Sequence, residues 1–171
     1  MLRLIALSTL LLSQFCWSKD SIKLFVQHEL NDTDTISSLG VSHSLLDTHS
    51  KVRGDLLASV GYAQIEDKDD IIQHFLTSDF GVRLGYYDKM FVYVEGGIDL
   101  LEILFRDFRD DPDYYYYDQS DNTPDGYAAV GAGIDSGKLK IEGFVKVRNI
   151  DSDNWDSKHH VFYGLQLSLS F

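Results

Sequence analysis

Two short runs in the sequence combine residue types that nucleophilic catalysis uses. His43 precedes Ser44. Further along, Thr77 and Ser78 precede Asp79. A serine nucleophile needs an imidazole within hydrogen-bonding distance, but adjacent residues of a β-strand point to opposite faces. His43 and Ser44 therefore cannot act as base and nucleophile if this segment is a strand, and we expect that the chain is not an enzyme.

Acidic side chains concentrate between the apolar segments. They are Asp32 and Asp34; Glu66, Asp67, Asp69 and Asp70; Asp110, Asp111, Asp113, Asp118, Asp121 and Asp125; and Asp151, Asp153 and Asp156. Carboxylates are hard oxygen ligands for divalent cations, but these runs lack the glycine and the terminal glutamate of a calcium loop. We expect solvated loops without a resident metal or other cofactor, with divalent cations as surface partners only.

The longest connection, residues 109–125, joins aspartate to tyrosine and holds both prolines. Tyrosine offers contact area at low entropic cost, and like-charge repulsion favours an open conformation. An alternative is extension of the preceding strand, because tyrosine has high β-propensity. We expect the partner contact of this loop to come from Asp111, Asp113, Tyr114, Tyr115, Tyr116, Tyr117 and Asp118.

The first 18 of the 171 residues have the pattern of a cleaved signal peptide. Arg3 precedes a mostly apolar stretch, and Cys16 and Ser18 occupy the minus-three and minus-one positions before Lys19. The stretch is shorter than the ~20 residues of a spanning helix, which disfavours a membrane anchor. Phe15 disfavours lipidation at Cys16. We expect residues 19–171 to form one domain without cysteine, whose charge (−12 for the whole chain) disfavours nucleic-acid binding.

Alternation of apolar and polar residues dominates the chain after residue 21, as in strands with two different faces. Turn residues divide this region into eight predicted strands, near 21–30, 35–46, 51–66, 71–87, 90–108, 126–135, 138–150 and 158–171. The second, fourth and sixth connections are short turns, whereas the others are acidic. Short turns opposite longer external loops are typical of outer-membrane barrels. The pattern predicts an all-β, eight-stranded antiparallel up-and-down transmembrane β-barrel.

The polar face of the predicted strands indicates which side is inside. It is rich in glycine and serine, which weaken a solvent-facing strand but suit the narrow lumen of eight strands. Its charges also balance, as buried charges must. The predicted lumenal network is Lys23, Arg53, Arg83, Lys140, Lys146 and Arg148 with Glu29, Asp55, Asp79, Glu95, Asp99 and Glu142. The alternative is the salt-bridged exterior of a soluble, lipocalin-like periplasmic barrel.

The last strand resembles the C-terminal strand of the small outer-membrane barrels, the families of outer-membrane proteins A and X. It alternates Tyr163, Leu165, Leu167, Leu169 and Phe171. The resemblance implies that this strand is the signal read by the barrel assembly machinery. Residues 125–134 are similar to a strand of the YfaZ-like barrels. Aromatic residues near strand ends, Tyr62, Tyr86, Phe91, Tyr163 and Phe171, suit membrane-interface girdles.

Together these patterns predict an integral protein of the Gram-negative outer membrane, with a structural or surface-interaction role. We expect a polar lumen filled by side chains, which disfavours a porin-like diffusion channel. The expected partners are outer-membrane lipids, the assembly machinery and a surface partner at the acidic loops. Besides the soluble ligand-binding barrel, the resemblance leaves a lipid-modifying outer-membrane enzyme as an alternative.

Overall fold

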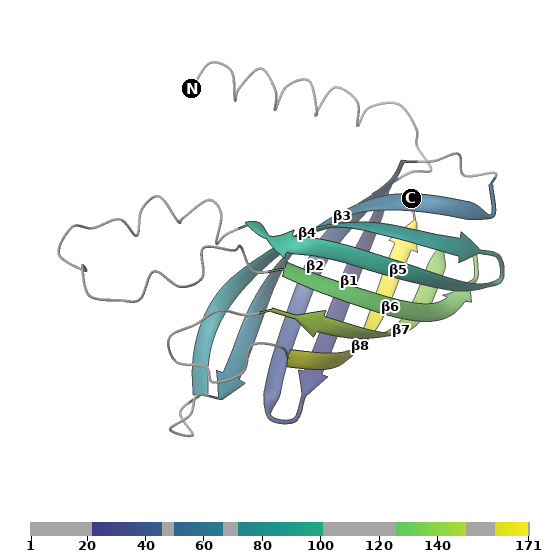
Figure 1. The fold of residues 1–171 in the computed structure, drawn as a ribbon. Helices are drawn as coiled ribbons and strands as arrows, with labels where there is room; N and C mark the ends of the chain where they lie inside the picture. The colour runs from purple at the N-terminus through teal and green to yellow at the C-terminus, as the bar shows by residue number, and fades with distance from the viewer. Residues whose placement is uncertain (1–21, 46–49, 67–71, 101–125, 150–159, 171) are drawn as a thin grey trace, which may run out of the picture.

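The computed structural model of the chain describes residues 22–45, 50–66, 72–100, 126–149 and 160–170. They form eight strands: β1 (Ile22–Asn31), β2 (Asp34–Ser44), β3 (Val52–Glu66), β4 (Ile72–Tyr87), β5 (Met90–Asp99), β6 (Gly126–Asp135), β7 (Leu139–Arg148) and β8 (His160–Ser170). Each strand pairs antiparallel with the next, and β8 pairs with β1 to close a barrel (Figure 1). The predicted fold class is confirmed. The predicted signal peptide lies outside the described residues.

The structure differs from the prediction most clearly at the end of β5 and at the first connection. β5 ends at Asp99 rather than at residue 108. The rest of the predicted segment, residues 101–108, lies outside the described residues. The first connection, expected to be an acidic loop, is a two-residue hairpin in which Asp32 adopts a positive φ of 53°. Aspartate tolerates this left-handed conformation better than most residues.

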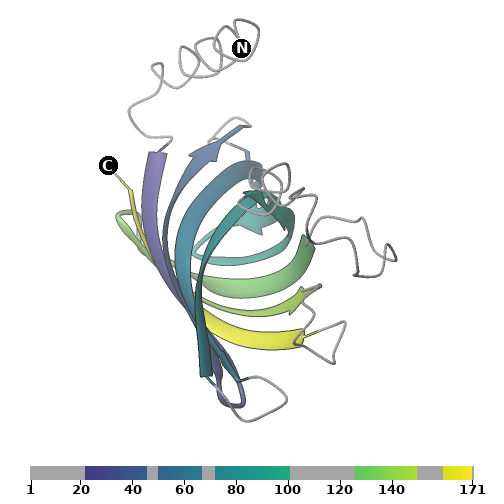
Figure 2. The ribbon, with the colours of Figure 1, turned by 90° about the vertical axis from the view of Figure 1, so that its left-hand side faces the viewer.

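The two ends of the barrel differ in their connections. At one end, which we call the turn end, lie the start of β1, the end of β8 and the β2–β3, β4–β5 and β6–β7 connections (Figures 1 and 2). At the other, the loop end, lie the β1–β2, β3–β4, β5–β6 and β7–β8 connections. No helix in the described part of the chain is long and apolar enough to span a membrane.

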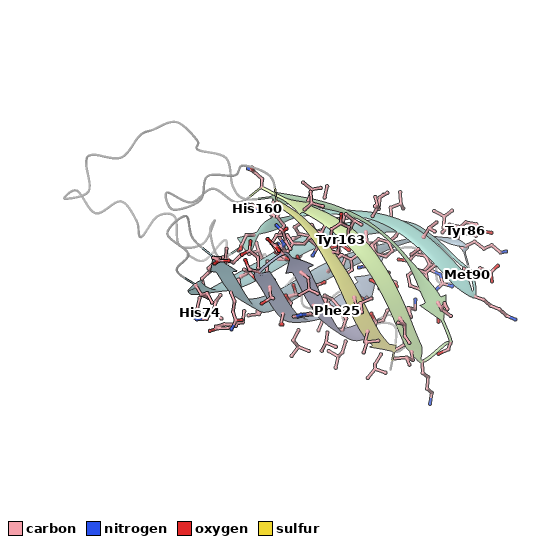
Figure 3. The ribbon with its side chains drawn as sticks, turned by 90° about the horizontal axis from the view of Figure 1, so that it is seen from below. Phe25, His74, Tyr86, Met90, His160 and Tyr163 are labelled. Carbon is pink, nitrogen blue, oxygen red and sulfur yellow. The ribbon has the colours of Figure 1, made fainter. Side chains whose placement is uncertain are left out.

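The exposure of the strands follows their alternation, with polar side chains inside and apolar side chains outside. Along β1, Lys23, Gln27 and Glu29 are buried, whereas Leu24 and Val26 are exposed. The same inversion runs around the whole wall, whose outward side chains are mostly aliphatic (Figure 3). A soluble barrel shows the reverse order, so the outer surface of this barrel has the polarity of a protein interior.

Small residues make room for rings inside the barrel. A side chain added at Gly164 would collide with the ring of Phe144, and one added at Gly131 would collide with that of Tyr93. Gly40 stands in the same relation to Phe25. These contacts explain why the inward positions mix glycine with aromatic residues: eight strands enclose little more than the space that side chains fill.

Two clusters of buried apolar side chains lie inside the barrel. Ile36, Ala63, Ile65 and Phe162 form one cluster, on strand segments toward the loop end. Tyr87, Phe91, Tyr93 and Phe144 form the other, nearer the turn end. The assignment of Phe91 to an outer girdle is wrong, because the residue is 2% exposed and its ring stacks on that of Tyr87 inside. Its parity in β5 places it inward, on the side of Tyr93.

Candidate functional site: the lumenal charge network

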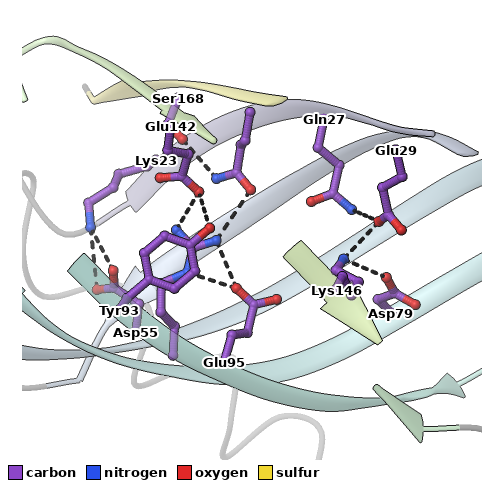
Figure 4. A network of polar contacts seen from close by, with 12 residues as sticks. Lys23, Gln27, Glu29, Asp55, Asp79, Tyr93, Glu95, Glu142, Lys146 and Ser168 are labelled. Carbon is purple, nitrogen blue, oxygen red and sulfur yellow. Dashed lines mark hydrogen bonds and ion pairs between the residues drawn. The ribbon is translucent and has the colours of Figure 1, made fainter. Parts of the chain in front are cut away.

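Four charged side chains on β1, β4 and β7 form the cluster nearest the loop end, which we call the loop-side cluster. Arg148 binds Glu29 through Nε–H···Oε2 at 2.9 Å and Asp79 through Nη1–H···Oδ1 at 2.8 Å. Lys146 lies 2.8 Å from Glu29 and 3.7 Å from Asp79 (Figure 4). All four side chains are buried. Two bases therefore face two acids, and each charge contacts both groups of opposite sign.

A second cluster surrounds Arg83 in the middle of the barrel. Its guanidinium lies 2.7 Å from a carboxylate oxygen of Glu95 and 2.8 Å from one of Glu142. Tyr93 donates its hydroxyl to Glu142 at 3.0 Å, and its ring lies 3.8 Å from the guanidinium. Gln166 accepts a further hydrogen bond from Arg83. One base is thus held by two acids, a π face and a neutral acceptor (Figure 4).

Two further lysines are buried toward the turn end. Lys23 lies 3.1 Å from Asp55, which also accepts a 2.7 Å hydrogen bond from Ser44. Lys140 lies 3.0 Å from Asp135, beside the rings of Tyr87 and Phe91. Desolvation of an ammonium group is costly unless an anion and hydrogen bonds replace water. Both lysines have such an anion.

The structure places ten of the twelve predicted lumenal residues inside the barrel, and they are five bases and five acids. They are Lys23, Arg83, Lys140, Lys146 and Arg148, with Glu29, Asp55, Asp79, Glu95 and Glu142. Arg53 is half-buried at the turn end, where it lies over the ring of Tyr87 and donates to the Ser50 carbonyl. Asp99 is half-buried at the loop end of β5 and accepts from the Ser78 amide.

A small cavity lies beside the loop-side cluster. Its volume is about 30 Å³, and Thr77, Asp99, Tyr127 and Arg148 are among its lining residues. A cavity needs about 10–15 Å³ of such space to hold one water molecule. The cavity can hold a water against the charged cluster, but it is too small for an organic ligand.

A serine–histidine contact on the outer wall escaped the sequence analysis. The Nδ1 atom of His28 lies 2.8 Å from Oγ of Ser37, and both side chains point outward from the β1–β2 hairpin. A hairpin centred on Asp32 and Thr33 pairs His28 with Ser37. The position of this turn in the sequence could therefore have predicted the contact. Among the described residues no carboxylate binds this imidazole, and backbone amides between paired strands are used in the ladder. The pair therefore lacks the orienting acid and the oxyanion donors of an acyl-transfer site.

The sequence pairs first considered for catalysis lie apart. Ser44 faces inward and donates to Asp55, whereas His43 pairs in register with the outward Ile22 and Leu56. Asp79 is inside, bound to Arg148. In the described part of the chain, no three His, Cys, Asp or Glu side chains are placed to hold a metal ion.

One exposed ion pair links the turns of the turn end. Lys51 donates to Asp88 at 2.9 Å across the mouth of the β3–β4 pair. This hydrogen bond raises the pKa of Lys51 and, from the other side, lowers the pKa of Asp88. Both side chains are exposed, so the pair is a surface feature and not part of the buried network.

Of the predicted assembly signal, Tyr163, Leu165, Leu167 and Leu169 point outward from β8. Phe171 lies outside the described residues. The predicted contact loop, Asp111, Asp113, Tyr114, Tyr115, Tyr116, Tyr117 and Asp118, also lies outside them.

Comparison with known proteins supports the fold and no closer relation. No family model matches the chain, and no curated protein matches it by sequence. The N-terminal β-barrel domain of Pseudomonas aeruginosa OprF is similar in structure, with a TM-score of 0.54, 12% identity, and coverage of 90% of this chain and 98% of that one. A barrel from the de novo design of transmembrane β-barrels is similar with a TM-score of 0.53 and 13% identity, over 90% and 98% of the two chains.

A third structure, the outer membrane enzyme PagL, gives a TM-score of 0.48 at 12% identity over 88% of this chain and 99% of that one. That score is too low to carry an argument about activity. The first two matches define the class: the chain has the closed eight-stranded antiparallel fold of small outer-membrane barrels.

Proposed function

We propose that this protein is an integral outer-membrane protein whose barrel is a filled scaffold. The observation that carries the proposal is the inverted polarity of the barrel: a mostly aliphatic outer wall encloses ten buried charges, each paired with a charge of opposite sign. In water, that wall would be a continuous apolar surface far larger than soluble monomers expose. In a bilayer it is the surface that the hydrocarbon requires.

The same arrangement argues against a channel through which solutes diffuse. Arg148 links β7 to β1 and β4, and Arg83 links β4 to β5 and β7, so salt bridges cross the lumen from wall to wall. The apolar clusters at Ile36 and Phe91 fill the lumen on either side of these bridges. We propose that the lumen is closed to solutes. Interaction with partners is then left to the acidic connections of the loop end.

The barrel is proposed to sit with the loop end outside the cell and the turn end in the periplasm, after export by the signal peptide. We also propose that the assembly machinery recognises β8 and Phe171. The same proposal includes membership of this chain in the families of outer-membrane proteins A and X or in the YfaZ-like barrels. The rival soluble barrel would need an apolar cavity for its ligand, and the inward face of this chain is charged instead.

Fractionation tests the proposal. We expect the mature chain to remain with outer membranes after high-salt and carbonate washes, and to be released by detergent. Unheated protein should migrate faster on electrophoresis than boiled protein, because the folded barrel survives the detergent. Release of the mature chain in washes without detergent would show that the barrel is soluble. Unchanged lipid A acylation on overproduction is the result expected of a barrel without lipid-modifying activity.

A further inference from the structure

The outer wall carries a shallow apolar groove on β4, β5, β6 and β7, nearer the turn end. Its volume is about 700 Å³, within the range of sites that hold a small organic ligand. Val92, Ala132 and Gly143 lie side by side in register along its floor, and Tyr86 is next to Val92 on β4. The groove faces away from the lumen, so only a component of the surrounding bilayer or another protein in it can occupy it.

Basic side chains stand at the end of this groove. Lys89 in the β4–β5 turn and Lys138 in the β6–β7 turn are both exposed. The backbone ties the two turns together, since the Asp135 amide donates to the Lys89 carbonyl at 2.9 Å. Figure 3 shows Tyr86 and Met90 at this end of the barrel, opposite His74 and His160.

The acids of these two turns are each matched by another lysine. Asp88 binds Lys51, and Asp135 binds Lys140. Among the described residues of the turn end, the ammonium groups of Lys89 and Lys138 are thus in excess. An apolar groove that ends at two excess cations complements an amphiphile with an acyl chain and an anionic headgroup.

We propose that this groove binds one glycerophospholipid with an anionic headgroup, from the periplasmic leaflet. Its acyl chain lies along Val92, Ala132 and Gly143, and its headgroup lies against Lys89 and Lys138. The inference rests on the proposed function, because the turn end faces the periplasmic leaflet only if the barrel spans the outer membrane in that orientation.

Spin-labelled lipids test the proposal with the full mature chain in phosphatidylcholine bilayers. Insertion is scored first by the faster electrophoretic migration of the unheated barrel. Electron paramagnetic resonance then compares motionally restricted phosphatidylglycerol with phosphatidylcholine labelled at the same acyl carbon. We expect about a fivefold preference for phosphatidylglycerol, the effect of about one basic residue near an anionic lipid surface. Lys89→Gln combined with Lys138→Gln should abolish the preference, and arginine at both positions should retain it.

A groove-filling variant tests the acyl chain separately from the headgroup. A Cβ added at Gly143 would have no neighbouring atom closer than 3.9 Å, so we expect Gly143→Leu to fill the groove while the barrel still folds. Gly96→Leu is the matched control, because Gly96 is also exposed, has its nearest neighbour at 3.7 Å and lies outside the groove. We expect Gly143→Leu to remove the preference for phosphatidylglycerol and Gly96→Leu to leave it unchanged.

Three results overturn the proposal. An inserted barrel that restricts both lipids equally shows that the groove has no headgroup selectivity, and the proposed function still stands. Cross-linked dimers that disappear in Gly143→Leu, without a lipid preference, show that a second copy occupies the groove. A chain that does not insert at all overturns the proposed function as well, and the electrophoretic assay distinguishes that case from the other two.

Discussion

The loop-side cluster and the Arg83 cluster use the same chemistry with different charge balance. In the loop-side cluster, Glu29 and Asp79 are shared between Lys146 and Arg148, so two charges of each sign cancel. In the other cluster, Arg83 alone faces Glu95 and Glu142. Loss of any member unbalances the first cluster, whereas loss of one acid brings the second to neutrality. The number of buried charges therefore says less about stability than the charge that a substitution leaves behind.

The largest effect should come from Arg148→Met, which leaves Glu29 and Asp79 with Lys146 as their remaining base in the cluster. Breaking a buried pair by removing one partner costs about 3–5 kcal/mol, because the other charge stays desolvated. Urea unfolding of the refolded barrel in vesicles measures the loss. Arg148→Lys is the control, since it keeps the charge and should recover part of the stability. A cost below about 1 kcal/mol would indicate that water reaches the cluster and solvates the acids.

Glu95→Gln should cost less than Arg148→Met. It removes one of the two acids that face Arg83 and leaves the guanidinium paired with Glu142 at 2.8 Å. A lost hydrogen bond to a charged group costs about 1.5–3 kcal/mol. The matched variant is Glu29→Gln, which unbalances the loop-side cluster and should cost more in the same unfolding assay. Equal costs for the two glutamates would show that charge balance does not distinguish the clusters, and no cost at Glu95 would place this side chain in water.

Tyr93→Phe should have a smaller effect again, at the low end of about 1.5–3 kcal/mol for a hydrogen bond to a charged group. It removes the 3.0 Å hydrogen bond to Glu142 but keeps the ring that lies 3.8 Å from Arg83. Tyr93→Leu removes the ring as well and should destabilise the barrel further in urea. If phenylalanine and leucine were equally destabilising, the ring would contribute nothing to holding Arg83.

The sequence predicted the barrel because each strand has to present one face to the lumen and one to the outside. Period-two alternation therefore located all eight strands, and the parity of Lys146 and Arg148 placed them on one face with Glu142. The prediction failed at the limits of this pattern. Beyond Asp99 the apolar residues lose the alternation, and β5 ends there. Residue type suggests an outer girdle position for Phe91, but its parity in β5 places it inside, where it is buried.

The partners of the charged residues across the lumen could not be predicted from the sequence. Glu29 and Arg148 are 119 positions apart and meet only because the barrel closes between β1 and β8. Alternation gives the face of each residue but not its height along the barrel, which depends on the stagger of the closed sheet. Face alone could therefore select the members of the network, but not the partner of Arg83 or the separation into clusters. The His28–Ser37 contact was more accessible, because it depends on one hairpin register.

The exposed pair between Lys51 and Asp88 should have the smallest effect and the simplest pH dependence. The hydrogen bond from Lys51 lowers the pKa of Asp88 from its ordinary value of 3.8, so the pair stabilises the folded state above that pH and is lost as the pH falls through the lowered value. The same bond raises the pKa of Lys51 from 10.5, so the stabilisation is complete below pH 10.5 and is lost only as the pH rises through the raised value.

Between these limits the difference in unfolding midpoint between the wild type and Asp88→Asn should be constant and small, since exposed pairs contribute little. Acidification through the range below 3.8 should remove it, and salt should weaken it at neutral pH. A difference that persisted at acid pH would have to come from another contact of the Asp88 side chain, such as the hydrogen bond from the Lys89 amide at 2.9 Å. In that case Asp88→Asn would not measure a purely ionic contact in water, and its effect could not be compared with those of the buried clusters.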